Sequence, residues 1–365
     1  MKVAIIILGN SWICPYVNIY KDFLEKSGVE YDVILWDRDG SDSNGHTRQC
    51  EKGKICFDTG NMNLGNPLLK MFAYVKYARF IKRTVCANEY DRLILSGPHL
   101  AILLSSFLKK KYKGRYILDY RDISVEQYPF LSRLYDDALS GSYGNVISSP
   151  GFKKYLPTRY DYFVSHNFNV YKAKKALSSP SGWSGADEPL DILTIGAIRN
   201  YDSNVKILQS LANNGSYRLR FVGSGEASPL LAEYARENNI ENVEFSGFYK
   251  KEDEESLVAE CDFINIYFPD NVEHSSIMSN RFYLSLMYKK PMIVTAGSVQ
   301  AALVEKYGLG IVIGETQELD AEIRNFISAF DYEKYVTESN RLLASFVEEH
   351  ECLEKLVAGF VGVKQ

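Results

Sequence analysis

The chain has 365 residues and a formal net charge of −4, and 46% of its residues are apolar. This apolar content is enough for one large hydrophobic core or, as is more typical of this length, for two. No apolar run approaches the roughly 20 residues that span a bilayer, and the opening residues 1–8 are too short and unflanked for a signal peptide. The six cysteines form no Cys-x-x-Cys pair and there is no histidine cluster, so we expect reduced, buried thiols in a cytosolic protein.

The charge is distributed unevenly along the chain. Residues 1–165 carry 23 Lys and Arg against 17 Asp and Glu, a net of +6, and the remainder has a net of −10. This asymmetry predicts that the N-terminal half meets an anionic partner. The basic run 109–115 is either a solvated face or a patch for anionic lipid.

The first residues predict a parallel, doubly wound sheet. An apolar run over 3–8 has strand length, a turn follows at Gly9, and a helix over about 14–27 leads to a second strand over 31–36. In such sheets the turn after the first strand lies at the ligand-binding edge. Its single glycine is no dinucleotide fingerprint, which disfavours a dinucleotide oxidoreductase. Residues 39–65 are polar and without periodicity, so we predict a long loop there.

A charged cluster follows the strand predicted over 116–123. Arg121 and Asp122 stand at its carboxyl end, with Glu126 just beyond. Such a cluster is either a functional site or a structural ion pair. Because an arginine stays protonated, Arg121 is suited to an electrostatic or positional role and not to that of a base.

The second half restarts the same alternation after a Ser-, Gly- and Pro-rich segment at 175–188, the predicted hinge. A strand over 191–195 runs into a turn that carries Arg199. A strand over 219–223 ends in a glycine turn at Gly223, and a further apolar segment ends at Tyr249. These turns should again lie at the carboxyl edge of a parallel sheet.

Residues 279–295 predict a helix, a sharp stop and a buried strand. Ser279 or Asn280 can cap the helix, and Pro291 prevents its continuation. Free amides at the helix start, with Arg281 in the first turn, form an anion site. The alternative is an ordinary capped helix with a solvated arginine.

The order of these segments resembles that of nucleotide-sugar glycosyltransferases of family 4 (group 1), which have the GT-B architecture. The resemblance implies two Rossmann-like domains facing across a cleft, with a donor diphosphate held by arginines and a helix start, and no metal or other cofactor. The candidate ligand-binding residues are Gly9, Arg199, Gly223, Tyr249, Ser279, Asn280 and Arg281. The candidate catalytic residues, on the acceptor side with His99, are Arg121, Asp122 and Glu126.

The chain departs from that family's pattern at three positions. Leu284 stands where a ribose-binding glutamate is expected, Ser276 where its acidic partner is expected, and Lys289 where glycine usually ends the helix. Leu284 and Ser276 favour a rival interpretation, a degenerate and non-catalytic binding or scaffold protein of the same architecture. A nucleotide-sugar epimerase is a further, less favoured rival.

The resemblance implies transfer of a sugar from a nucleotide diphosphate to a saccharide or lipid-linked acceptor, with retention, in surface or capsular polysaccharide assembly. We predict an acceptor-side domain over 1–170, a linker over 171–188, a donor-binding domain over 189–345, and a helix over 346–365 that returns to the first domain. We expect no nucleic-acid partner, and a location in the cytoplasm or on the inner face of the membrane.

Overall fold

The computed structural model describes residues 1–38, 42, 53–59, 65–179, 183 and 189–363. The chain divides into two compact units, Met1–Asn167 with Glu349–Gln365, and Phe168–Glu348. The first boundary lies just before the predicted linker. The predicted linker itself is partly wrong, because helix α5 (Val170–Ser178) occupies its first half and belongs to the second unit.

The first unit is built on a seven-stranded parallel sheet with the order β3-β2-β1-β4-β5-β6-β7. Its strands are β1 (Lys2–Ile6), β2 (Glu30–Asp37), β3 (Lys54–Asp58), β4 (Arg92–Ser96), β5 (Tyr116–Tyr120), β6 (Gly144–Ile147) and β7 (Tyr162–Val164). The strand order reverses between β1 and β4, and ligands of doubly wound sheets bind at such a switch point. Strand β3 corrects the prediction of an uninterrupted loop over 39–65.

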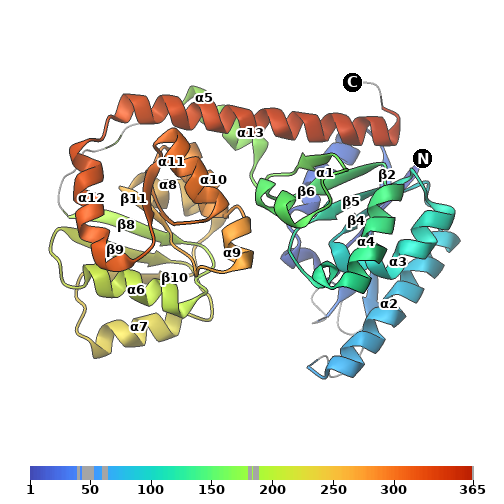
Figure 1. Ribbon diagram of the computed structural model, residues 1–365, viewed down its shortest axis with the longest axis horizontal. Coiled ribbons are helices and arrows are strands. Elements are labelled where there is room, and N and C mark those ends of the chain that lie inside the picture. Colours follow the sequence, from blue (N-terminus) through green and yellow to red (C-terminus); the bar gives the residue numbers. More distant parts are fainter. Residues whose placement is uncertain (39–41, 43–52, 60–64, 180–182, 184–188, 364–365) are drawn as a thin grey trace. The chain divides into compact units, whose positions relative to one another are not determined.

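Helices cover both faces of this sheet. They are α1 (Val17–Lys26), α2 (Pro67–Ala87), α3 (Pro98–Lys111) and α4 (Pro129–Gly141), with short 3-10 helices η1 (Ser11–Ile13), η2 (Val125–Gln127) and η3 (Pro150–Tyr155). Val3, Ile5 and Ile7 pack in one cluster with residues of α1 and of the last turns of α13 (Tyr332–Val361). The opposite face of the sheet meets α2, whose Tyr77 hydroxyl donates to the carbonyls of Ile7 and Ile34. Helices α2, α3 and α4 lie together (Figure 1).

The second unit has a six-stranded parallel sheet with the order β10-β9-β8-β11-β12-β13. Its strands are β8 (Leu190–Ile195), β9 (Tyr217–Val222), β10 (Val243–Gly247), β11 (Phe263–Ile266), β12 (Met292–Thr295) and β13 (Gly310–Ile313). Here the strand order reverses between β8 and β11, so the expected ligand edge is the carboxyl end of these two strands.

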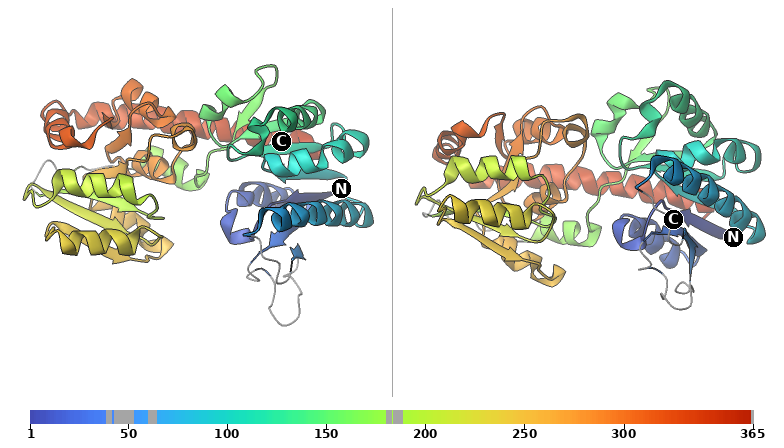
Figure 2. Two further views of the ribbon diagram at one scale, coloured as in Figure 1. Left: turned by 60° about the horizontal axis from the view of Figure 1, so that its bottom comes forward. Right: turned by 90° about the horizontal axis from the view of Figure 1, so that it is seen from below.

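Two apolar clusters enclose the second sheet. The helices besides α5 are α6 (Tyr201–Leu211), α7 (Ser228–Glu237), α8 (Glu254–Ala259), α9 (Val272–Ser276), α10 (Asn280–Tyr288), α11 (Val299–Tyr307) and α12 (Leu319–Ser328), with η4 (Lys251–Asp253) and η5 (Thr316–Glu318). Residues of α6, α7 and α12 cover one face and those of α5, α8, α10, α11 and α13 the other. Figure 2 shows α6 and α7 on the side of the sheet opposite α10 and α11.

The cysteines differ from the expectation. Among the cysteines that the structure describes, Cys56 is disulfide-bonded, Cys86 and Cys352 are exposed, and Cys14 and Cys261 are the buried free thiols that were predicted. Among the described residues, no helix is long and apolar enough to cross a membrane.

Candidate functional site

Two loops approach closely at the carboxyl edge of the second sheet, and glycines permit the approach. Gly223 has a φ of +135°, and a Cβ there would lie 1.9 Å from the carbonyl oxygen of Gly196. A Cβ on Gly225 would lie 2.2 Å from the carbonyl oxygen of Ile198. Only glycine fits such a close backbone contact. The predicted residue Gly223 therefore shapes the turn that follows β9.

Arg281 lies at the switch point of the second sheet. It is in the first turn of α10, and its guanidinium donates to carbonyls from the ends of both flanking strands: Nε to Ile195 at 2.6 Å and Nη1 to Asn265 at 3.2 Å. Nη2 donates to Ala197, in the loop after β8, at 3.1 Å. Only 6% of the residue is exposed. The alternative of a solvated arginine is therefore wrong.

The charge of Arg281 is poorly compensated. Burial lowers its pKa from 12.5 to about 10, and Tyr249 is the ionisable neighbour that raises it. In the part of the chain that the structure describes, no carboxylate forms an ion pair with it. The guanidinium donates to three carbonyl dipoles, which use three of its five N–H groups, and it lies 5.7 Å from the ring centre of Phe268. A buried cation of this kind attracts an anion.

The start of α10 is capped as predicted, and Ser279 is the cap. Its hydroxyl accepts from the backbone N–H of Arg281 at 3.2 Å, and its own N–H donates to the side chain of Gln300 at 3.0 Å. Asn280 is the first helical residue and is exposed. The helix dipole thus directs its positive end toward the same edge as Arg281.

The loop after β8 contributes Arg199 and a neighbouring pair that the sequence did not single out. Arg199 is exposed. Asn200 is left-handed, with a φ of 56°, and its amide donates to Nε2 of His274 at 3.3 Å. The other ring nitrogen of His274 lies 2.9 Å from Oδ1 of Asn271, which places the ring proton on Nδ1. Burial lowers the pKa of His274, so the ring is neutral near pH 7.

The structure also places three further residues that the sequence analysis named. Tyr249 is half-buried, its hydroxyl donates to Glu254 at 3.3 Å, and burial raises its pKa to about 12. Leu284 belongs to the apolar core with an exposure of 8%. Ser276 is fully buried, and its hydroxyl donates to the carbonyl of Val272 at 2.8 Å. The position of α10 at which the resemblance implies a ribose-binding glutamate is therefore apolar here.

In the first unit, Arg121 belongs to a buried ion pair. Its Nη2 lies 2.6 Å from Oδ2 of Asp119 and also donates to the hydroxyl of Ser165 at 2.9 Å. Its guanidinium stacks 4.4 Å from the ring centre of Tyr16. Asp119 also accepts from Tyr20 at 2.9 Å. Arg121 therefore forms a structural ion pair, which was one of the two alternatives predicted from the sequence. A positional role for Arg121 is compatible with this ion pair.

Glu126 and Asp122 differ in their surroundings. Glu126 is buried and accepts from the Tyr120 hydroxyl at 2.6 Å and from the Ser124 N–H at 2.9 Å. Its carboxylate is therefore occupied in holding the loop after β5. Asp122 is exposed. His99, at the start of α3, stacks on Tyr74 with 5.5 Å between ring centres, and burial lowers its pKa. The neutral ring of His99 lies beside the switch point.

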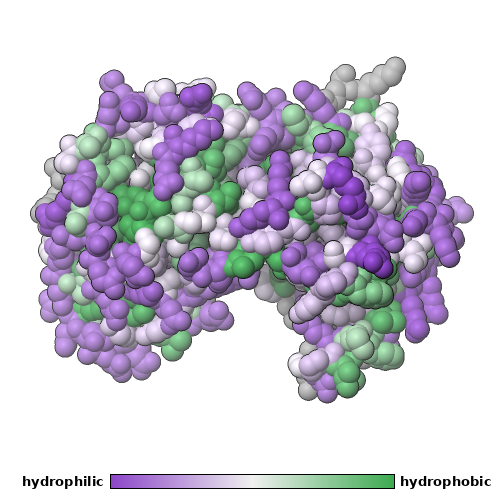
Figure 3. Space-filling model, in the orientation of Figure 1, coloured by the Kyte–Doolittle hydropathy of each residue, from purple (hydrophilic) through white to green (hydrophobic). Residues whose placement is uncertain are grey.

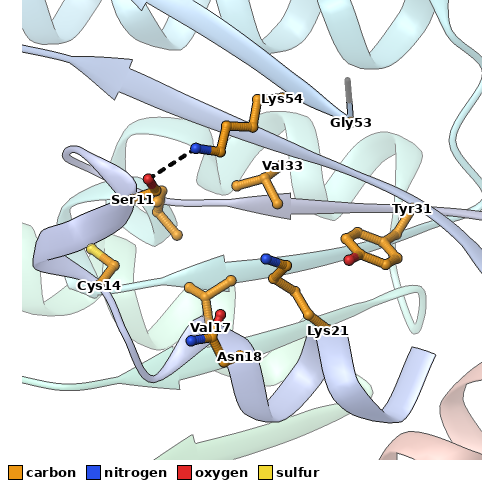
Figure 4. A pocket seen from close by; sticks show the side chains of 10 residues that line it. Ser11, Cys14, Val17, Asn18, Lys21, Tyr31, Val33, Gly53 and Lys54 are labelled. Carbon is orange, nitrogen blue, oxygen red and sulfur yellow. Dashed lines mark hydrogen bonds between the residues drawn. The ribbon is translucent and has the colours of Figure 1, made fainter. Parts of the chain in front are cut away.

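A cavity of about 380 Å³ opens beside the turn that follows β1. Figure 4 shows Lys21 of α1 and Lys54 of β3 on opposite sides of it, with the Lys54 ammonium bonded to the Ser11 hydroxyl at 3.2 Å. Gly9 is buried next to this turn, yet a Cβ there would meet nothing within 4 Å. The structure thus gives no steric reason for glycine at this predicted site.

The sequence matches no protein-family model and no functionally curated protein. Solved structures with the same fold include a sucrose-phosphate synthase from Thermosynechococcus elongatus, with a TM-score of 0.71, 12% identity and 99% coverage of both chains. They include HepE from Anabaena in complex with UDP, with a TM-score of 0.66, 15% identity, and 99% and 100% coverage. They also include the lipopolysaccharide outer core galactosyltransferase WaaB, with a TM-score of 0.64, 14% identity, and 98% and 99% coverage. The predicted GT-B fold is confirmed.

Proposed function

We propose that this GT-B protein is a glycosyltransferase that moves a sugar from a nucleotide diphosphate to a saccharide or lipid-linked acceptor. The observation that carries the proposal is the buried guanidinium of Arg281, which lies at the carboxyl ends of β8 and β11. It donates to carbonyl dipoles, and none of the carboxylates that the structure describes pairs with it. HepE, which has the same fold, was solved with UDP. A diphosphate would supply the missing negative charge at Arg281.

The chemistry follows from the charge that develops during transfer. Breaking the glycosidic bond leaves an anionic nucleoside diphosphate and a sugar with oxocarbenium character. Arg281, the exposed Arg199 and the amides at the start of α10 would stabilise the leaving diphosphate without a metal ion. We also propose that the anomeric configuration of the sugar is retained and that the leaving phosphate takes the proton of the acceptor hydroxyl. WaaB has the same fold and acts on lipopolysaccharide outer core, which supports an acceptor in surface polysaccharide assembly.

A panel of nucleoside diphosphates tests the donor site. A diphosphate at 100 times its dissociation constant should raise the free energy of unfolding by about 2.7 kcal/mol, which thermal denaturation detects. Arg199→Ala should weaken binding of the best ligand about 5-fold, as expected for an exposed charge-assisted contact of about 1 kcal/mol. Arg236→Ala is the control, because Arg236 is exposed on α7 and pairs with Glu233. Absence of stabilisation by any diphosphate would refute the donor site.

A degenerate binding protein is the second candidate, and the placement of Leu284 in the core favours it. Both candidates predict nucleotide binding. They differ in turnover, so isothermal titration followed by a donor-hydrolysis assay separates them. Hydrolysis of a nucleotide sugar at a rate above that of the Arg281→Ala variant supports the enzyme, and binding without turnover supports the binding protein.

An anionic membrane surface is part of the proposal, and the apolar start of α2 supports it. Leu68, Met71 and Phe72 are 72%, 62% and 48% exposed, with Lys70 and Lys76 exposed beside them. Figure 3 shows apolar surface gathered at this end of α2, at the lower right. Apolar side chains flanked by lysines suit the interface of an anionic bilayer. By contrast, Lys109 in the basic run pairs with Asp137, and Lys111 lies 3.6 Å from the Cys86 sulfur.

Vesicle co-sedimentation tests this surface. We expect the chain to bind vesicles rich in phosphatidylglycerol at low salt, and the triple variant Leu68→Ser, Met71→Ser, Phe72→Ser to bind at least about 5-fold less. The side chains are exposed, so the fold should not change. Leu230→Ser, which alters an exposed leucine of the second unit, is the control. Equal sedimentation of the triple variant and the control would remove α2 as the contact.

A further inference from the structure

A second cavity lies among α5, α8 and α10 of the second unit, and its lining is strongly basic. It measures about 290 Å³ and is lined by Lys172 and Lys175 of α5 and by Lys289 and Lys290 just after α10. Glu255 is the acidic residue among its recorded lining. Four lysines and one glutamate among the lining residues give the cavity a net positive charge.

Lys289 is unusual in both its backbone and its side chain. It ends α10 in the left-handed conformation, with a φ of 56° and a ψ of 47°, which favours glycine. Its side chain is 1% exposed, and burial lowers its pKa to about 8. A glycine would avoid both the strained backbone and the buried charge. The lysine therefore calls for an explanation beyond ending the helix.

The recorded contacts of the two buried lysines leave most of their donors available. Nζ of Lys289 donates to the carbonyl of Leu286 at 2.7 Å, and Nζ of Lys290 donates to the carbonyl of Ala259 at 2.8 Å. Each ammonium has three N–H groups, so each recorded carbonyl uses one of them. In the described part of the chain, neither lysine forms an ion pair with a carboxylate. The bond to the carbonyl at the end of α10 thus uses one N–H group of the Lys289 ammonium, and the other two N–H groups have no role in capping the helix.

We propose that this lysine cavity binds a small molecule that carries phosphoryl groups. Lys289 and Lys290 supply buried donors at its wall, and the exposed Lys172 and Lys175 supply further charge from α5. Ammonium groups are point charges suited to phosphate oxygens. The cavity is distinct from the proposed donor site, because Arg281 and Lys289 stand at opposite ends of α10, about 12 Å apart along the helix axis.

Inorganic pyrophosphate is the probe, titrated calorimetrically into the full chain at constant ionic strength. Lys289→Gly should bind one equivalent less than the wild type, whether or not the donor site also takes pyrophosphate. The loss of one equivalent is therefore expected even if the proposed donor site binds no nucleoside diphosphate. The double variant Lys172→Gln, Lys175→Gln, which alters exposed side chains only, should lower the affinity of the same site at least 5-fold. Lys306→Gln, an exposed lysine of α11, is the control and should bind like the wild type.

Thermal denaturation gives a second readout. Without pyrophosphate, Lys289→Gly should unfold at the same temperature as the wild type or at a higher one, since glycine relieves the left-handed backbone and removes the buried charge. The proposal is overturned if Lys289→Gly keeps the wild-type stoichiometry and affinity. It is equally overturned if sodium sulfate at the same ionic strength binds as tightly as pyrophosphate, because the lysines would then attract any anion.

Discussion

Arg281→Ala should weaken binding of a nucleoside diphosphate at least about 10-fold, the loss expected for a charge-assisted contact of about 1.5–3 kcal/mol. The same change should lower the free energy of unfolding. Three charge-assisted bonds to Ile195, Asn265 and Ala197 are lost, each worth about 1.5–3 kcal/mol. Against this, the fall in pKa from 12.5 to about 10 corresponds to a burial cost of about 3 kcal/mol that the variant no longer bears. The net loss is about 1.5–6 kcal/mol.

Arg220→Ala is the matched control for this prediction. Arg220 is another buried arginine of the second unit, 4% exposed, with Nε 2.7 Å from Oδ2 of Asp191. Removing it leaves Asp191 buried without its main partner, which costs about 3–5 kcal/mol. Diphosphate affinity, measured by titration calorimetry well below the unfolding transition, should stay within about 2-fold of the wild type, because Arg220 donates to no group at the switch point. If both variants lose affinity equally, Arg281 acts through stability and not through the ligand.

The sequence predicts the regular parts of the fold well, because buried parallel strands are short apolar runs. Strands β1 and β8 are such runs, and the cap at Ser279 follows from a hydroxyl residue placed before an apolar face. Strand β3 was missed, because it is an edge strand of five residues, half-buried and within a polar stretch. Helix α5 was missed because the Ser- and Pro-rich signal begins at its last turn.

The candidate site shows why residue types alone do not determine roles. The carbonyl partners of Arg281 come from residues up to 86 positions away in the chain, so no local pattern separates a buried guanidinium from a solvated one. Arg121 similarly bonds to Ser165, 44 residues later. His274 is a single histidine in a polar loop of the sequence, and its contacts with Asn200 and Asn271 in the structure give the ring a fixed orientation. Such roles follow from topology, which brings the strand ends together.

Breaking the buried pair in the first unit should have the other large effect. Asp119→Ala leaves the guanidinium of Arg121 buried without its carboxylate and removes the acceptor of the Tyr20 hydroxyl. We expect the free energy of unfolding, measured by urea denaturation, to fall by about 3–5 kcal/mol. Tyr20→Phe, which removes only the neutral donor, is the milder control and should cost about 1 kcal/mol.

A double-mutant cycle separates the ion pair from the packing around it. Arg121→Met alone strands the carboxylate and Asp119→Leu alone strands the guanidinium. The double variant removes both charges and should cost less than the sum of the single changes by at least about 1 kcal/mol. If the single losses add within about 0.5 kcal/mol, the two side chains are not coupled and the ion pair does not organise this edge. Diphosphate affinity should be unchanged in all three variants, because the proposed donor site lies in the second unit. Sugar transfer should fall in each, since Arg121 holds the loop that carries Asp122 and Glu126 through its bonds to Asp119 and Ser165.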